Sequence, residues 1–335
     1  DGFRVDYAHV VPQEFWQWAL PRARERDPNV WFGAEAYETA MDKIPGFTLK
    51  SLVHSGFDAV YNDELYDFLR EELLLKDGWA NDITSFLEKN QDIRDSLLHY
   101  AENHDEARLN ARRRDDDLSA SGLENPWVAR PMCSVLFLAT HGPNLIYNGQ
   151  ESGERAEGDE GFGRDDGRTS IFDYWTMTQH AQWVVEDHSY TGEGYSEEQK
   201  ELRKFYEHIG ALARSPLFAE GERYNIQGFN KDTEGYGPGK DIYSFVRYDK
   251  EGNAALVVAN FSKDAKKIPK VKLPPDFFET AGLSQDTTFQ MKSLMGNAKI
   301  AKAATASGLS EQGLEVEVDA YGLSVIELTP QSKPL

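Results

Sequence analysis

Asp1-Gly2-Phe3-Arg4-Val5-Asp6 is the stretch that decides the fold we predict for this chain. It is a short apolar run that ends on a carboxylate, with an arginine two places earlier. Residues i and i+2 of a β-strand point to the same side, so Arg4 and Asp6 would lie side by side. A nearby positive charge favours the ionised carboxylate, which a nucleophile or a metal ligand requires. An isolated Arg-x-Asp is most often a structural salt bridge, so the interpretation depends on the rest of the chain.

Strands and helices alternate after this stretch. Residues 12–23 carry apolar side chains at helical spacing, and residues 30–34 form a second short apolar run that ends on Glu35. Strand, helix and strand between Asp6 and Glu35 make up one βαβ unit, and two more units of similar length lead to Asp105. Further strands are predicted at residues 57–61, 97–102 and 142–147. Further helices are predicted at residues 64–75, 82–89, 125–138 and 196–213.

The pattern changes after residue 215. Helical periodicity stops, and strand-like runs follow at residues 242–248, 254–261, 314–318 and 321–328. We therefore predict an α/β catalytic domain over residues 1–215, the C-terminal part of a (β/α)8 TIM barrel, followed by an antiparallel β-sandwich domain over residues 216–335. A closed barrel needs eight strands and five are visible. We expect the missing N-terminal barrel half to be supplied by the full-length chain or by another chain.

Composition narrows the class of protein. The net charge is −21, from 57 acidic and 36 basic residues, and it disfavours a nucleic-acid partner because such a surface repels phosphates. No apolar run approaches the roughly 18–20 residues of a membrane span, so we expect a soluble protein without a membrane span. Cys133 is the single cysteine and forms no internal disulfide. The compartment stays open, with an extracytoplasmic location favoured.

Three carboxylates follow predicted strands: Asp6, Glu35 and Asp105. In a (β/α)8 barrel the C-terminal ends of the strands carry the chemistry, so the three would meet on one face. Glycoside hydrolysis needs a nucleophile or base and a protonated acid across the scissile bond. The alternative is that each acid only caps the helix that follows it. Three acids at regular spacing favour the functional interpretation.

Four motifs carry a resemblance to a known family. The stretch from Asp1 to Asp6, followed by His9, resembles the nucleophile motif of the α-amylase family of glycoside hydrolases. Gly33-Ala34-Glu35-Ala36 resembles the acid/base motif, and Glu102-Asn103-His104-Asp105 resembles the motif after the seventh barrel strand. Residues 142–151 resemble the eighth-strand segment. Their order and spacing agree with the family along the whole chain.

The resemblance implies a role for each site residue. Asp6 would attack the anomeric carbon to form a covalent glycosyl-enzyme, Glu35 would act as acid and base, and Asp105 would stabilise the distorted sugar. Arg4 would hold Asp6 ionised. The other expected substrate-binding residues are His104, Tyr7 and His9. The implied activity is retaining hydrolysis of α-glucans or maltooligosaccharides, with the two reacting carboxyls about 5–5.5 Å apart.

Departures from the family pattern keep two alternatives open. His9 lies three residues after Asp6, as in a branch that includes maltosyltransferases, whereas the commoner pattern has a Lys-His pair. That branch lacks the His-Asp pair kept at residues 104–105, so hydrolysis is favoured over a transglycosylase or isomerase on the same scaffold. A non-catalytic glycan-binding relative is the other alternative, but such relatives usually lose one of the three carboxylates.

The chemistry requires no cofactor, and the metal ligands are unknown. A structural calcium is an open expectation, with His9 through its carbonyl and the acidic loop 151–173 through Asp159, Asp165 or Asp166 as candidate ligands. A solvated acidic loop is the simpler interpretation, because no spacing matches a known calcium loop. Several aromatic residues could stack on sugar faces: Tyr37, Trp127, Tyr147, Phe172 and Trp175. The run Arg112-Arg113-Arg114 reads as a solvated loop, with a phosphate contact as the alternative.

Overall fold

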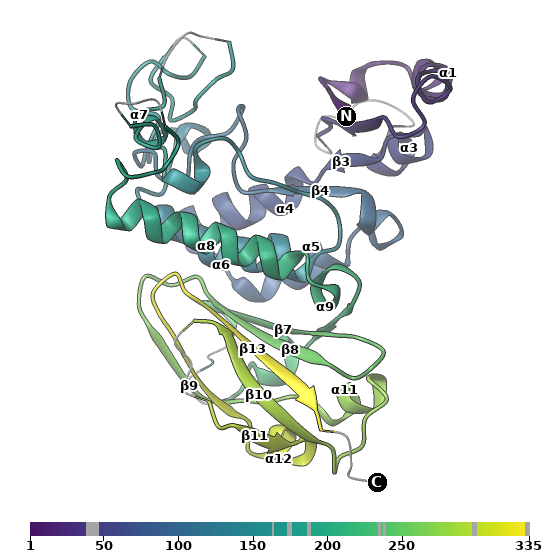
Figure 1. Cartoon of the computed structure of the whole chain (residues 1–335), viewed down its shortest axis with the longest axis vertical. Helices are drawn as coiled ribbons and strands as arrows, with labels where there is room; N and C mark the ends of the chain where they lie inside the picture. The colour runs from purple at the N-terminus through teal and green to yellow at the C-terminus, as the bar shows by residue number, and fades with distance from the viewer. Residues whose placement is uncertain are drawn as a thin grey trace.

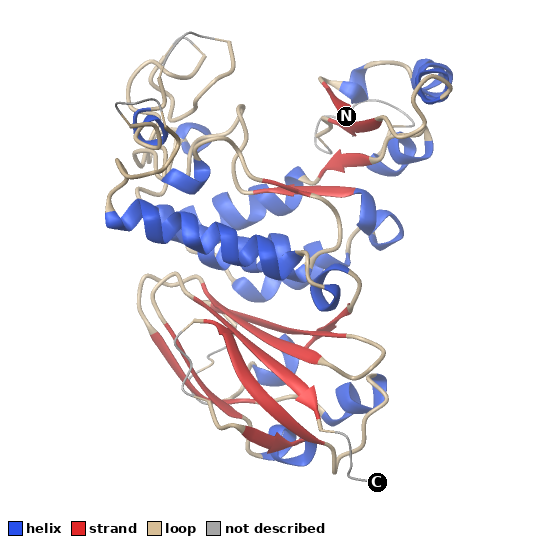
Figure 2. Ribbon diagram, in the orientation of Figure 1, coloured by secondary structure: helices blue, strands red, loops and turns tan. Residues whose placement is uncertain are grey.

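The structure is a computed structural model that describes residues 1–37, 47–162, 164–172, 176–185, 189–233, 236, 239–296 and 300–331. Parallel strands and helices form one part of the molecule, and an antiparallel β domain forms the other (Figures 1 and 2). The long helix α8, Glu197–Ala213, lies between the two parts.

The first part contains a five-stranded parallel sheet with the order β1-β2-β3-β4-β5. Its strands are β1 Gly2–Val5, β2 Trp31–Ala34, β3 Ala59–Tyr61, β4 Leu97–Tyr100 and β5 Asn144–Leu145. The helices of this part include α1 Gln13–Arg24, α3 Leu49–His54, α4 Asp63–Asp67, η2 Phe68–Leu75, α5 Ile83–Glu88, α6 Ala129–Cys133, η7 Ser134–Ala139 and α8. They also include η1 Ala8–Val10, η3 Ala80–Asp82, η4 Gln91–Ser96, η5 Leu118–Ala120, η6 Pro126–Val128, η8 Gln150–Ser152 and α7 Thr178–Ala181. The predicted C-terminal part of a (β/α)8 barrel is thereby confirmed.

The register of the parallel sheet sets which side chains share a face. Arg4 pairs with Gly33, and Gly33 pairs with Ala59, so these three residues lie on one face. The opposite face carries apolar residues such as Phe32 and Val60, which pack with α1 and α3 in one buried cluster. The sheet is therefore anchored on its helix-covered face, and the face that carries Arg4 is the one available for chemistry.

Strand β5 is shorter than the predicted strand 142–147. A Cβ on Gly142 would lie 1.8 Å from the carbonyl oxygen of Leu97, so only glycine fits where the chain crosses the start of β4. After β5, the amide of Tyr147 bonds to the Gln150 side chain at 3.1 Å and the chain turns. Sequence periodicity gave no sign of either constraint.

Gly142→Ala is expected to lower the free energy of unfolding by about 1–3 kcal/mol or more, because the added methyl meets backbone rather than a movable side chain. Gly210→Ala in α8 is the matched control. A Cβ there meets only the Arg214 guanidinium, at 3.5 Å, and alanine in a helix is favoured over glycine by up to about 1 kcal/mol. Urea unfolding of both variants checks the prediction, and equal stabilities would contradict it.

The second part is an antiparallel β domain. A six-stranded sheet has the order β11-β10-β13-β8-β7-β6, and a separate two-stranded sheet joins β12 and β9. The strands are β6 Glu222–Asn225, β7 Ile242–Tyr248, β8 Ala254–Asn260, β9 Lys266–Val271, β10 Thr288–Met295, β11 Ala303–Thr305, β12 Leu314–Val318 and β13 Leu323–Pro330. The helices are α9 Pro216–Ala219, α10 Gln227–Asn230, α11 Pro275–Thr280 and α12 Ala306–Glu311.

Two buried clusters use the two faces of the six-stranded sheet. Phe245 and Val257 belong to the cluster that includes Leu136 and Phe205 of the barrel helices. Their chain neighbours Val246 and Leu256 form the next pair of the two strands and belong to the cluster that fills the β domain. The six-stranded sheet thus packs directly on the helices of the first part. Among the helices in the described ranges, none has the length and apolar character needed to cross a bilayer.

Candidate active site

The ends of β1 and β2 lie side by side and place the first two carboxylates together. The Glu35 amide donates to Val5 O at 2.9 Å, and the Ala8 amide donates to Glu35 O at 3.1 Å, so pairing continues past the strand ends. Between Asp6 and Ala8 the chain turns sharply at Tyr7, which has left-handed backbone angles (φ 47°, ψ 40°). Such angles cost a non-glycine residue about 1–3 kcal/mol and often occur at functional sites.

Arg4 joins the three predicted carboxylates. Its Nη1 lies 2.6 Å from Asp6 Oδ1, and its Nη2 lies 2.8 Å from Glu35 Oε1 and 3.6 Å from Asp105 Oδ2. Burial alone would lower the pKa of Arg4, but hydrogen bonding to Tyr61 and Asp6 and the charge of Glu35 outweigh it and raise that pKa. A single fixed cation therefore connects acids that are far apart in the sequence.

The first two carboxylates have opposite exposure. The Asp6 side chain is 73% exposed, whereas that of Glu35 is 2% exposed. Glu35 accepts hydrogen bonds from the Tyr7 amide at 2.7 Å and the Tyr37 hydroxyl at 3.0 Å, besides the contact with Arg4. Burial and the charges of Glu35 and Asp105 raise the pKa of Tyr37, so this hydroxyl stays a neutral donor. Glu35 is thus held in one orientation, while Asp6 is accessible.

Asp105 lies in the loop after β4 and is oriented by its own motif. Its amide donates to Asn103 Oδ1 at 2.8 Å, and its Oδ2 lies 3.0 Å from His104 Nε2. Glu102 does not face the other acids. It forms a buried ion pair with Arg108 at 2.8 Å and accepts the Leu109 amide at 2.8 Å. Glu102 therefore anchors the loop, and Asp105 and His104 reach the cluster.

Tyr7 and His9 lie beside the cluster in different ways. Tyr7 is exposed and contributes its amide to Glu35. His9 is buried, stacks on Tyr7 at 5.5 Å between ring centroids and meets Tyr37 edge-on at 6.1 Å. The structure therefore places His9 behind the residues that hold Glu35, and its expected contact with substrate stays a prediction.

Two partners of the cluster were not identified from the sequence. The Arg4 guanidinium lies 5.9 Å from the centre of the Tyr61 ring, and Tyr61 is the last residue of β3. Tyr37 was expected only as a sugar-stacking residue, yet it bonds to Glu35. Tyr61 ends β3, and Tyr37 follows the end of β2 by three residues. Period-two alternation puts Tyr37 on the side of Glu35, and this signal could have found it.

The other aromatic candidates lie further from the carboxylates. Tyr147 stacks on Arg108 at 4.1 Å, Trp127 on Arg130 at 3.8 Å, and Phe172 contacts Phe162 at 5.6 Å. Trp175 lies outside the described residues. The contacts of these three rings are with other residues, so their stacking on sugars stays a prediction.

The acidic loop does not gather a metal-ligand set in the part that the structure describes. Asp166 is buried and ion-paired with Arg168 at 2.5 Å, and Asp165 is paired with Arg114 at 2.7 Å. Over the described ranges, no group of three or more His, Cys, Asp or Glu side chains could hold a metal ion. A structural calcium therefore stays a prediction, and no chemical step is assigned to a metal.

Glu106 adds a pH-dependent term to stability. Burial raises its pKa to about 7, with Arg70 opposing the shift, and it accepts a hydrogen bond from the Tyr66 hydroxyl at 3.3 Å. Because this pKa is raised in the folded chain, its contribution to stability is complete below about pH 4.5. The contribution is then lost as the pH rises through 7, by roughly 3 kcal/mol in total.

Glu106→Gln is expected to remove this loss, so that the free energy of unfolding falls less between pH 4.5 and pH 8 than in the parent chain. Asp116→Asn also removes one carboxylate, but at an exposed position, so its free energy of unfolding should depend on pH as in the parent chain. Urea unfolding at several pH values compares the three proteins. The same slope in Glu106→Gln and the parent would show that Glu106 is not responsible.

Comparisons with known proteins bear on the fold. No protein-family model matches the sequence, and no curated protein sequence matches it. The solved α-amylase of Geobacillus thermoleovorans, complexed with acarbose, superposes with a TM-score of 0.64 at 17% identity, over 100% of this chain and 60% of that one. The α-amylase of H.orenii gives 0.61 at 19% identity, over 98% and 61%.

A third solved structure extends the same similarity. The cyclic α-maltosyl-(1→6)-maltose hydrolase of Arthrobacter globiformis superposes with a TM-score of 0.58 at 14% identity, over 98% of this chain and 56% of that one. This chain thus spans about three fifths of the length of these structures. Its parallel half-barrel and antiparallel β domain together have the fold of the α-amylase-family structures.

Proposed function

We propose that the protein is a retaining α-glucan hydrolase that acts by double displacement. The observation that carries the proposal is the contact of one arginine, Arg4, with Asp6, Glu35 and Asp105 at the C-terminal ends of parallel strands. This is the edge at which barrel enzymes hold their catalytic groups. The similar solved structures are glycoside hydrolases, and one of them is complexed with acarbose.

The first step is assigned to Asp6 and Glu35. An Asp6 carboxylate oxygen attacks the anomeric carbon while Glu35 gives its proton to the leaving glycosidic oxygen, so a glycosyl–Asp6 ester forms as the glycosidic bond breaks. Arg4 Nη1 lies 2.6 Å from Asp6 Oδ1 and would orient this carboxylate for the attack. The high exposure of Asp6 suits a group that must meet substrate.

The second step reverses the roles. Glu35 removes a proton from water, the water oxygen attacks the anomeric carbon, and Asp6 leaves as a carboxylate. Two inversions give net retention. Tyr37 and the Tyr7 amide hold Glu35 in place through both steps. Asp105 and His104 would bind sugar hydroxyls, since together they offer an acceptor and a donor at 3.0 Å from each other.

The product anomer tests the proposal. We expect maltooligosaccharides to release α-anomers first, detected by ¹H NMR before mutarotation, in a preparation with all eight barrel strands present. Release of β-anomers would contradict double displacement. The transglycosylase alternative would instead be favoured if longer oligosaccharides form at high substrate concentration and little hydrolysis product appears. Binding without turnover would favour the glycan-binding alternative.

A further inference from the structure

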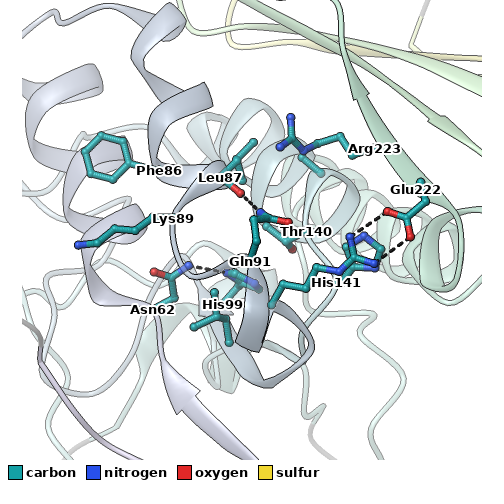
Figure 3. A pocket seen from close by; sticks show the side chains of 13 residues that line it. Asn62, Phe86, Leu87, Lys89, Gln91, His99, Thr140, His141, Glu222 and Arg223 are labelled. Atoms are coloured by element: carbon teal, nitrogen blue, oxygen red, sulfur yellow. Dashed lines mark hydrogen bonds and ion pairs between the residues drawn. The ribbon is translucent and has the colours of Figure 1, made fainter. Parts of the chain in front are cut away.

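A small cavity lies away from the carboxylate cluster, between the parallel sheet and the β domain. Its walls come from β4, the segment before β4, the end of η7 and the start of β6 (Figure 3). The cavity volume is about 60 Å³. A single buried water needs about 10–15 Å³ on this measure, so the cavity holds a few waters or one small ion, but not a sugar ring.

His99 presents an unpaired donor to this cavity. The side chain is 1% exposed, and its Nδ1 lies 3.4 Å from the Asn62 amide nitrogen (Figure 3). Because an amide nitrogen only donates, Nδ1 accepts and the ring proton lies on Nε2. Burial lowers the pKa of His99 to about 3, so the ring is neutral. Its Nε2 has no hydrogen-bond partner within the described part of the chain.

The rest of the lining favours a negatively charged ligand. Arg223 contributes a second buried donor, because its Nη1 also has no hydrogen-bond partner within the described ranges. Glu222 is the one carboxylate of the lining, and Arg94 neutralises it through two contacts of 2.8 Å. Lys89 also lines the cavity, whereas the neighbouring His141 has a pKa lowered to about 4 by burial and Arg247. Lys89 is itself ion-paired with Glu64, so three cations, Lys89, Arg94 and Arg223, face two carboxylates, Glu64 and Glu222. The site thus keeps a net positive charge in a chain whose net charge is −21.

We propose that this cavity binds a small oxyanion of phosphate or sulfate size. The anion would accept hydrogen bonds from His99 Nε2 and Arg223 Nη1. These bonds would stabilise the fold, because a buried donor without an acceptor costs about 1–3 kcal/mol. His99 belongs to β4 and Arg223 to β6, so the bound anion would connect the parallel sheet with the antiparallel sheet. The proposal is independent of the proposed glycosidase activity.

Titration with inorganic phosphate, sulfate and acetate at constant ionic strength tests it. We expect one saturable site per chain with a Kd of about 1 mM by calorimetry, and a rise in Tm with phosphate that sodium chloride does not reproduce. In protein labelled with ¹⁵N-histidine, phosphate should shift the Nε2 resonance of His99. Tighter binding of phosphate or sulfate than of acetate supports the proposal, and tighter binding of acetate would overturn it.

Variants locate the site. His99→Phe and Arg223→Met should each weaken phosphate binding roughly tenfold or more, whereas His54→Phe and Arg112→Met, at exposed positions, should not change it. If His99→Phe does not fold, the shift of the His99 resonance with phosphate in the parent protein tests the site instead. Unchanged affinity in both cavity variants would mean an adventitious ion only. An unshifted His99 resonance with no saturable binding would mean that the cavity holds structural water only, and either result overturns the proposal.

Discussion

Asp6→Asn is expected to lower kcat/KM on maltooligosaccharides by about 10³-fold or more, with little change in the free energy of unfolding. An amide cannot form the glycosyl ester, so the covalent route is lost. Stability should change little because the Asp6 side chain is 73% exposed and surface ion pairs contribute about 0–1 kcal/mol. Steady-state kinetics and urea unfolding on the same preparation check the two parts of the prediction.

External azide separates the role of Asp6 from that of Glu35. In Asp6→Ala, azide should occupy the place of the carboxylate and give a β-glycosyl azide by a single inversion. In Glu35→Ala, azide should attack the glycosyl–Asp6 ester from the opposite face and give an α-glycosyl azide. Asp116→Ala, at an exposed loop position, is the control and should give no azide product. The same azide anomer from both variants would contradict the assignment.

Arg4→Met should have the second-largest effect, and it should reduce both activity and stability. Loss of the guanidinium removes the contact of 2.8 Å with the buried Glu35 side chain, and removing one partner of a buried pair costs about 3–5 kcal/mol. Activity should fall by about 10²-fold or more, because the positions of three acids depend on this residue. Thermal unfolding and kinetics of the variant measure the two losses.

Controls distinguish the ion-pair role of Arg4 from a simple change of side chain. Arg4→Lys keeps the charge but loses the two-pronged contact with Asp6 and Glu35, so an intermediate loss is expected. Adding Glu35→Gln to Arg4→Met should restore part of the stability, which gives a coupling energy. Arg26→Met, at an exposed position, should be near neutral. Additive effects of Arg4→Met and Glu35→Gln would argue against the ion pair.

The sequence was sufficient for the order of the strands and for the meeting of Arg4, Asp6, Glu35 and Asp105. Both follow from short-range rules: period-two alternation fixes the face, and a parallel sheet brings strand ends to one edge. The antiparallel strands β7 and β8 were predictable for the same reason, since each is a continuous β-rich run beside a turn.

Features that depend on side-chain rotamers or on single backbone angles were not predictable. The left-handed turn at Tyr7 moves His9 behind Glu35, and a three-residue spacing from Asp6 cannot indicate that turn. The ion pairs of Asp165 with Arg114 and of Asp166 with Arg168 depend on side-chain rotamers, so the composition of the acidic loop could not indicate them. The cavity beside His99 was likewise not predictable, because its walls come from β4 and β6, which are far apart in the sequence.

Mass spectrometry of a trapped intermediate tests the central claim most directly. A 5-fluoroglucosyl fluoride slows the second step, so the ester accumulates if the carboxylates act by double displacement. We predict one glycosyl unit per active site, attached to the proteolytic peptide that contains Asp6 and absent from Asp6→Asn. A label on Glu35 or Asp105, or full turnover with no labelled peptide, would contradict the account.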